Sequence, residues 1–466
     1  MRTPPVTLPH LEPFRDALAE GQYDVAFALL EDVAQRLDDP RQRALYQLHL
    51  AAADALYGPG GVEHGLLALR DAAREDPETV HLPLYRAVHW EFRALQGATS
   101  GDVRKGVAAI GSDDPLAAFH AASALWWAGA SRSAKRRLLK LHEDDLPLYL
   151  RWRRWSLLGH AHADTGDPEA AAEAFAVAYD GATESERPLV RLHLAGALLE
   201  SNRAEEARRL LGEQPDDALA PLDRGWWFDL SGRVELDLDN PQRALENLDE
   251  ARRYLDDPVR LVDVDVERAH ALSALGRADE AAELLGRVAR DAEEGERSNL
   301  LHECAVAWID ADEPDAAFDV LSEVLLDPDY AYRAEATADL ADVQVRRGEL
   351  AEARTLAFRA LDDGATAPAC LVLGTIAYEY FDLEDATTWL ERAITASQPG
   401  DGTWLSAQSL IADVFAQRGS AFAERLLQHA RAALDHAPPG SEWVAALEAH
   451  VARAKQWLFG HERWLN

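Results

Sequence analysis

Apolar residues recur with helical spacing along most of the chain, and residues 155–178 show the pattern most fully. Ala171 and Phe175 stand at i and i+4 on one predicted helix, which follows another helix after the turn at Gly166. Gly159 on the first helix and Ala171 on the second are small, so the two helix axes can approach closely. This stretch therefore predicts two amphipathic helices joined by a tight turn.

The small residue of the second helix returns at a nearly constant interval. From Ala134 to Ala353 the successive spacings are 37, 36, 37, 37, 36 and 36 residues, which suit two helices and their turns. The aligned positions are Ala26, Ala134, Ala171, Ala207, Ala244, Ala281, Ala317, Ala353, Ala386 and Ala423. The spacing predicts an all-α, right-handed α-solenoid of about 12 antiparallel helix pairs with a C-terminal capping helix.

Prolines mark the start of some second helices. Pro168, Pro241 and Pro314 each follow an Asp, Asn or Glu, and they lie 73 residues apart, which is two units each time. Proline at the first helical position begins a helix well, because its missing N–H has no partner there in any case. These prolines predict helix starts in alternate units.

Two units carry a resemblance to the tetratricopeptide repeat family, whose pattern is W-x2-L-G-x2-Y, then A-x3-F and a proline. The first match is Trp155-x2-Leu158-Gly159-x2-His162 with Ala171-x3-Phe175, which departs from the pattern at the Tyr and at the closing Pro. The second match is Leu373-Gly374 with Ala386-x3-Leu390. The resemblance covers nearly the whole chain, with a period about two residues longer than the family's usual one. It implies a non-enzymatic scaffold in which the first helix of each unit lines a concave groove that binds a protein or peptide.

The regularity of the repeat divides the chain into three parts. Residues 1–112 form irregular N-terminal repeats, with Gly65 and Gly106 in the slot that alanine occupies elsewhere. Residues 113–437 form the regular solenoid, and residues 438–466 supply the C-terminal capping helix, because a terminal repeat needs a polar outer face.

Composition narrows the choice of partners. The 466 residues carry a formal net charge of −35, which argues against general binding to nucleic acid or to an anionic membrane. The chain shows no secretory signal and no apolar stretch long enough to span a bilayer, so the expected compartment is the cytoplasm. The two cysteines, Cys304 and Cys370, are too few for a disulfide framework and are expected to be buried thiols.

The residues at the positions that line the groove in this family form two zones along the chain. The earlier zone contains His120, Trp126, Trp127, Arg153 and His160. The later zone is acidic and contains Asp229, Asp263, Glu267, Glu303, Glu335, Asp339 and Asp342. Carboxylates accept charged hydrogen bonds, so the later zone suits a basic segment of a partner, although a chain this acidic would line any groove with acid. The residues expected to bind the partner are Trp126, Trp127, Arg153, His160, Asp229, Glu267 and Asp339.

Cations gather in one stretch. This basic island consists of Arg132, Lys135, Arg136, Arg137, Lys140, Arg151, Arg153 and Arg154. It could receive an acidic peptide or the acidic zone of another copy, and pairing with neighbouring acids within the chain is the plainer alternative.

Enzyme motifs are absent from the sequence. It contains no phosphate-binding glycine loop, G-x-S-x-G or H-E-x-x-H, so we expect no enzyme activity, cofactor or metal. The nearest approach to a metal site is Glu267-x2-His270 with His302-Glu303 one unit later. The alternatives to a protein-binding scaffold are a regulatory receptor for a peptide or small ligand and, less favoured, a metal-dependent enzyme.

Overall fold

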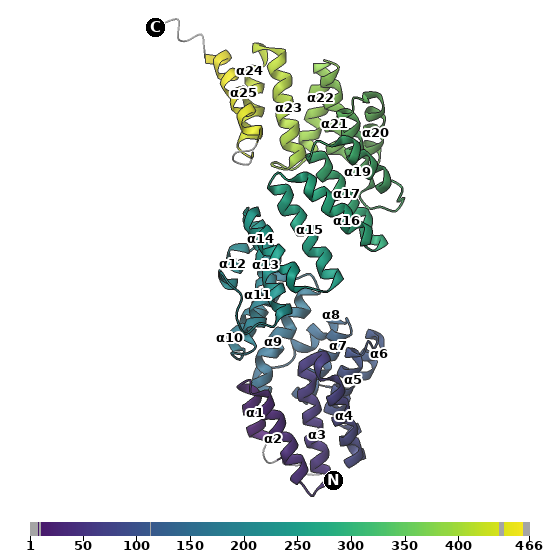
Figure 1. Ribbon diagram of the computed structural model, residues 1–466, viewed down its shortest axis with the longest axis vertical. Coiled ribbons are helices and arrows are strands. Elements are labelled where there is room, and N and C mark those ends of the chain that lie inside the picture. The colour runs from purple at the N-terminus through teal and green to yellow at the C-terminus, as the bar shows by residue number, and fades with distance from the viewer. Residues whose placement is uncertain (1–7, 9–10, 112, 438–441, 460–466) are drawn as a thin grey trace. The chain divides into compact units, whose positions relative to one another are not determined.

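The computed structural model describes residues 8, 11–111, 113–437 and 442–459, and within these ranges it contains helices and no strand. The chain forms two compact units, Met1–Asp256 and Asp257–Asn466. The described helices make twelve consecutive pairs, followed by the single helix α25 (Figure 1). The predicted all-α solenoid of helical hairpins is therefore confirmed. Residue 112 and residues 438–441 and 460–466, which include two of the predicted domain boundaries, lie outside the described residues, as does the start of the chain.

The first unit contains seven helix pairs within its described part. They are α1 (Leu11–Ala19) with α2 (Tyr23–Arg36), α3 (Pro40–Asp54) with α4 (Val62–Glu75), α5 (Pro83–Leu95) with α6 (Ser100–Val107), α7 (Pro115–Trp127) with α8 (Ser131–Leu138), α9 (Leu148–Ala163) with α10 (Pro168–Gly181), α11 (Arg187–Glu200) with α12 (Ala204–Leu211), and α13 (Pro221–Asp237) with α14 (Pro241–Tyr254). Short 3-10 turns η1 (Ala55–Gly61), η2 (Pro77–His81) and η3 (Glu143–Asp145) join some of them.

The second unit contains five pairs and α25 within its described part. They are α15 (Pro258–Ala274) with α16 (Ala278–Asp291), α17 (Glu294–Asp310) with α18 (Pro314–Val324), α19 (Arg333–Arg346) with α20 (Leu350–Asp362), α21 (Thr366–Glu379) with α22 (Leu383–Ala396), and α23 (Gly402–Arg418) with α24 (Ala423–Leu434), followed by α25 (Glu442–Phe459). The 3-10 turn η4 (Ser420–Phe422) precedes α24.

The repeated alanines lie at the contact between the two helices of a pair, as the spacing predicts. Every aligned alanine is buried, and all but Ala423 have no exposed surface. Gly159 shows why small residues are required, because a Cβ at that position would lie 2.7 Å from the ring of Phe175. The predicted proline starts are confirmed too, since Pro168, Pro241 and Pro314 begin α10, α14 and α18.

A left-handed residue ends the first helix of most pairs. Glycine takes this position in several turns, for example Gly166 with a φ of 75°. Asn202, Asp239, Asp312 and Phe381 adopt the same conformation with φ of 57° or 58°. Such a residue reverses the chain within a few positions, so each second helix can fold back on the first.

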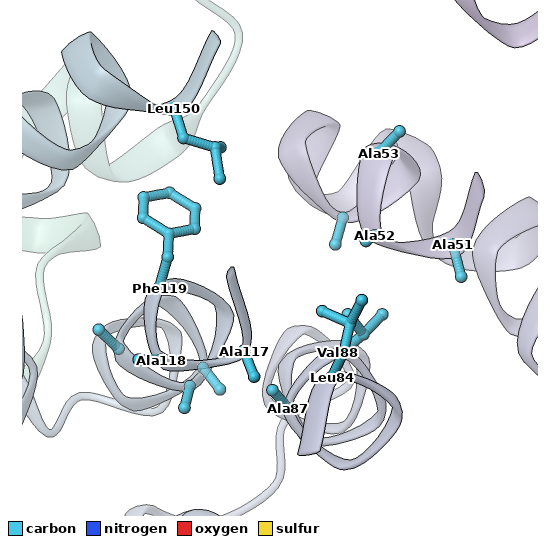
Figure 2. Packing of buried hydrophobic residues seen from close by; sticks show 14 of the residues in the cluster. Ala51, Ala52, Ala53, Leu84, Ala87, Val88, Ala117, Ala118, Phe119 and Leu150 are labelled. Atoms are coloured by element: carbon cyan, nitrogen blue, oxygen red, sulfur yellow. The ribbon is translucent and has the colours of Figure 1, made fainter. Parts of the chain in front are cut away.

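Successive first helices pack on one another through apolar side chains. Figure 2 shows Leu84 and Val88 of α5 beside the alanines of α3, and Phe119 of α7 pointing toward Leu150 of α9. These side chains belong to one buried cluster, which extends from α1 to α10. The core is therefore continuous across the first five helix pairs of the first unit, and a second buried cluster runs from α10 to α13, as expected of a solenoid.

The N-terminal pair makes contacts that the sequence pattern did not indicate. Helix α1 packs against α9 as well as against α2. Tyr23, the first residue of α2, donates a short hydrogen bond to Glu186, just before α11. The first pair thus contacts the fifth and sixth pairs of its own unit. Among the described helices, none is long and apolar enough to cross a membrane.

Candidate functional site

A cavity of about 380 Å³ opens between the first helices of four successive pairs in the first unit. Its wall comes from η1 and from α5, α7, α9 and α11. We call it the aromatic pocket, and it is lined by Ala55, Leu56, Tyr57, Gly58, Glu91, Phe119, Ser123, Trp126, Trp127, Trp152, Arg153, Ser156, Leu157, His160, Glu186, Leu189, Val190 and His193. Four of the five elements that form the wall are first helices of their pairs.

Ring side chains continue from this pocket across four first helices. Centroid distances are 4.7 Å from Trp127 to Trp126, 5.0 Å from Trp126 to His160, 4.4 Å from His160 to His193 and 4.8 Å from His193 to Trp226. We call these five side chains the aromatic row. Trp127 has 38% of its surface exposed, and the other four are partly exposed. The row therefore offers flat apolar surface to a ligand without any rearrangement of the fold.

Hydrogen bonds and burial fix the chemistry of this row. The indole Nε1 of Trp126 donates to Asp164 Oδ2 at 2.9 Å, and the hydroxyl of Ser131 donates to the same oxygen at 2.7 Å. Burial lowers the pKa of His160 to about 4, so its imidazole is neutral at pH 7. The centre of the row is consequently uncharged and suits stacking or apolar contact.

Arg153 is engaged within its own unit. Its guanidinium donates to Tyr23 Oη at 2.7 Å, to Glu186 Oε1 at 3.0 Å and to the carbonyl oxygen of Tyr149 at 2.9 Å. It also lies over the ring of Trp152, 4.3 Å from the centroid. Arg153 therefore joins the N-terminal pair to α9 and α11 along the rim of the pocket.

The structure brings together four of the predicted partner-binding residues. Trp126, Trp127, Arg153 and His160 all line the aromatic pocket. His120, which the groove positions also indicated, is only 1% exposed, and its Nδ1 lies 2.6 Å from an oxygen of the buried Glu91. The inclusion of His120 in the groove surface was wrong, because its helix turns this side chain into the core.

The remaining predicted residues lie elsewhere. Asp229 is partly exposed on α13 of the first unit, one turn beyond Trp226. Glu267 and Asp339 belong to the second unit, where each carboxylate has a histidine partner. His302 Nε2 lies 2.7 Å from Asp339 Oδ2, and His270 lies between Glu267 and Glu303 at 3.4 and 3.3 Å.

The carboxylates of Glu267 and Glu303 keep His270 protonated at neutral pH. Hydrogen bonds to Glu267 and then to Glu303 raise the pKa of His270 to about 9, so it is cationic at pH 7. Part of the predicted acidic zone is therefore neutralised by a histidine of the same unit. Within the described ranges, no group of three or more His, Cys, Asp or Glu residues is arranged to hold a metal ion.

Sequence reasoning found only four of the residues that line the pocket, and it missed His193, Trp226 and Tyr57 among the rings of the site. His193 and Trp226 occupy inward positions of the same groove numbering, so the spacing of the repeats could have indicated both. Tyr57 could not be found in this way, because it lies in η1 between α3 and α4 and reaches the pocket only through the fold. The two cysteines are buried free thiols, as expected.

The fold and the site define an all-α protein of consecutive helical hairpins with a ring-lined pocket on its first helices. No family model and no curated protein matches the chain. Among solved structures, a chain of the "Crystal structure of APC/C hetero-tetramer Cut9-Hcn1" is similar, with 14% identity, 96% of each chain covered and a TM-score of 0.39. At this score the similarity carries nothing about function, and the fold class rests on the helix pairs themselves.

Proposed function

We propose that the chain is a non-enzymatic scaffold that binds a protein or peptide on its first helices, with the aromatic pocket as the anchor. The observation that carries this proposal is the aromatic row, which is a continuous, partly exposed surface of rings across four first helices. Tryptophan and tyrosine dominate the binding energy of many interfaces, because a few large side chains lose most of the water.

Charge on the first helices favours a basic segment. Glu186 lies at the pocket, where Arg153 already pairs with it, and Asp229 lies near the far end of the aromatic row. The second unit carries further carboxylates on its own first helices, among them Glu267, Glu303 and Asp339. An arginine of the partner can stack on Trp127 while its guanidinium donates to a carboxylate, which combines both recognition modes.

Affinity capture from the native cell extract at two salt concentrations tests this proposal. Captured partners are mapped to synthetic peptides, and their affinities are measured by fluorescence anisotropy. We expect Trp127→Ala to weaken binding about tenfold or more, as loss of an anchor does. Tyr380→Ala removes a ring of the second unit that is more exposed than Trp127, 61% against 38%, and serves as the control. Equal affinity of both variants for every captured peptide would remove the pocket from the proposal.

The acidic part is tested separately by Glu267→Arg combined with Asp339→Arg. A basic peptide should bind this variant more weakly, and the difference should shrink at high salt, because screening weakens exposed charge pairs. Unchanged binding would refute the role of the acidic zone and leave the aromatic anchor standing.

The regulatory receptor remains a second candidate because of one observation. The volume of the aromatic pocket, about 380 Å³, falls within the range of small-molecule sites. This candidate predicts that a metabolite extract free of protein raises the melting temperature of the wild type and leaves that of Trp127→Ala unchanged. A shift of equal size in both proteins would exclude the pocket as the receptor site.

A further inference from the structure

A second cavity of the first unit has the opposite electrostatic character. It encloses about 470 Å³ between α6, α7 and α8. We call it the basic cavity, and it is lined by Arg104, Val107, Ile110, Gly111, Ala118, Leu125, Ser133, Arg136, Arg137, Lys140 and Leu141. Four of these side chains are cationic and none is a carboxylate, although acidic residues outnumber Lys and Arg by 82 to 47 in the whole chain.

Pairing within the chain accounts for only part of the basic island. Lys135 lies 3.4 Å from Asp167, Arg151 lies 3.6 Å from Asp144, and Arg153 is bound to Glu186 as described above. Three other cations, Arg104, Arg136 and Lys140, surround the mouth of the basic cavity and are not paired in this way within the described part of the chain. Among the residues that the structure describes, no carboxylate lies within ion-pair distance of Arg104, Arg136 or Lys140, and all three side chains are exposed.

The deeper part of the cavity is apolar, and a partly buried arginine joins its walls. Val107, Ile110 and Leu141 are buried, and Arg137 crosses between helices to donate to the carbonyl oxygens of Ile110 and Val107 at 2.5 and 3.2 Å. Burial lowers the pKa of Arg137, yet arginine stays charged at neutral pH. The cavity thus combines a cationic mouth with an apolar floor.

Helix α7 separates this cavity from the aromatic pocket. Ala118 and Leu125 face the basic cavity, whereas Phe119 and Trp126 face the aromatic pocket. The two sites therefore lie on different faces of the same helix and can be occupied together. An assignment for the basic cavity goes beyond the function proposed above and does not depend on it.

We propose that the basic cavity binds an acidic peptide segment of a partner protein. Carboxylates or phosphate esters of the segment accept hydrogen bonds from Arg104, Arg136 and Lys140, while an adjacent apolar side chain enters the floor beside Leu141. Clusters of arginine recognise such motifs because the guanidinium donates two parallel hydrogen bonds to a carboxylate or phosphate. The scaffold then joins two partners, with a basic segment on one face and an acidic segment on the other.

A peptide suits this cavity better than nucleic acid does. The cationic mouth is confined to one cavity, and the net charge of −35 repels an extended polyanion beyond it. A short segment feels mainly the local cations, because the field of more distant charges is screened over roughly 8 Å at physiological ionic strength. The apolar residues of the cavity floor also have no apolar group to contact in a phosphate backbone.

Three labelled peptides of one sequence test the proposal by fluorescence anisotropy with the full chain. They carry two phosphoserines, two glutamates or two serines next to a leucine, so the first two arms distinguish a phosphate from a carboxylate source. We expect one or both charged peptides to bind and the serine peptide to bind at least about tenfold more weakly. Replacing the leucine with glycine should weaken binding further, since the floor then stays unfilled.

Arg104→Glu combined with Lys140→Glu should reduce the affinity of the charged peptides by about a hundredfold, since two charged contacts become repulsive. Both side chains are exposed, so the fold should persist, and circular dichroism checks this. Arg70→Glu combined with Arg74→Glu on α4 makes the same change in net charge at side chains that are 57% and 68% exposed, and it should leave binding nearly unchanged.

Several outcomes would overturn the proposal. Failure of the wild type to bind either charged peptide would do so, as would an equal loss in both charge-reversal variants. Tighter binding of a thymidine oligonucleotide than of either peptide would assign the cavity to nucleic acid. Self-association that disappears in the cavity variant and in high salt, measured by light scattering, would assign it to the acidic surface of a second copy.

Discussion

The same substitution should have opposite effects on stability at two glycines of neighbouring first helices. Gly159 lies inside α9 and Gly196 lies inside α11. Helix propensity alone predicts that Gly→Ala at either position stabilises the protein by about 1 kcal/mol. The packing around the two positions differs, and this difference decides the sign.

At Gly159 the new methyl group has no room. It would lie 2.7 to 2.8 Å from three atoms of the Phe175 ring, which real Cβ atoms do not approach. The ring is buried and lies between His160 and His193, with centroids 5.0 and 5.5 Å away, so it cannot move aside freely. Overpacking of this kind costs about 1–3 kcal/mol, and after the gain in propensity we expect a net destabilisation of about 1 kcal/mol.

At Gly196 the same methyl group would meet only Leu230, at an ordinary contact distance of 3.6 Å. We therefore expect Gly196→Ala to stabilise its helix by up to about 1 kcal/mol. Because a repeat chain of two units does not unfold in one step, hydrogen exchange of amides in α9 to α11 is the appropriate assay. Stabilisation of α9 by Gly159→Ala, equal to that produced by Gly196→Ala in α11, would refute the packing argument.

Three further outcomes follow from particular residues. The pKa of His270 rises from 6.5 in the unfolded chain to about 9 in the folded one, so its contribution to the free energy of unfolding is complete below pH 6.5 and is lost as the pH rises through 9. We expect the second unit to lose about 1 kcal/mol of stability over this range, a value reduced because the side chain is half exposed. His270→Gln should flatten this pH dependence in urea titrations. Phe381→Gly should stabilise the second unit by about 1 kcal/mol, because a 78% exposed side chain at a φ of 58° is strained; an unchanged urea midpoint would contradict this. Arg153→Met should lower the local stability of the N-terminal pair by about 2 kcal/mol, because Glu186 and Tyr23 lose a charged partner. Hydrogen exchange should become faster in α1 and α2 and stay unchanged in α13 and α14.

The sequence alone determined the class of fold and the packing of each helix pair. A period of 36 or 37 residues leaves room for two helices and little else, and a close helix contact accepts only alanine or glycine. These constraints act between residues that are close in the chain, so a single sequence reveals them. The groove positions implied by the family resemblance likewise placed Trp126, Trp127, Arg153 and His160 on one surface, and the structure has all four on first helices beside one pocket.

Only the tertiary structure decided which side chains are available at that surface. The groove numbering does not reveal that His120 is buried beside Glu91, with which it interacts. Nor does it reveal that Arg153 donates a hydrogen bond to Tyr23, which lies 130 residues away in the chain. It could not separate the paired cations of the basic island from those at the mouth of the basic cavity, because that cavity needs Arg104 from another helix pair. The charge state and burial of a side chain depend on its neighbours in space. A repeat pattern specifies which helices pack together along the chain, but it does not specify which side chains from distant helices contact each other.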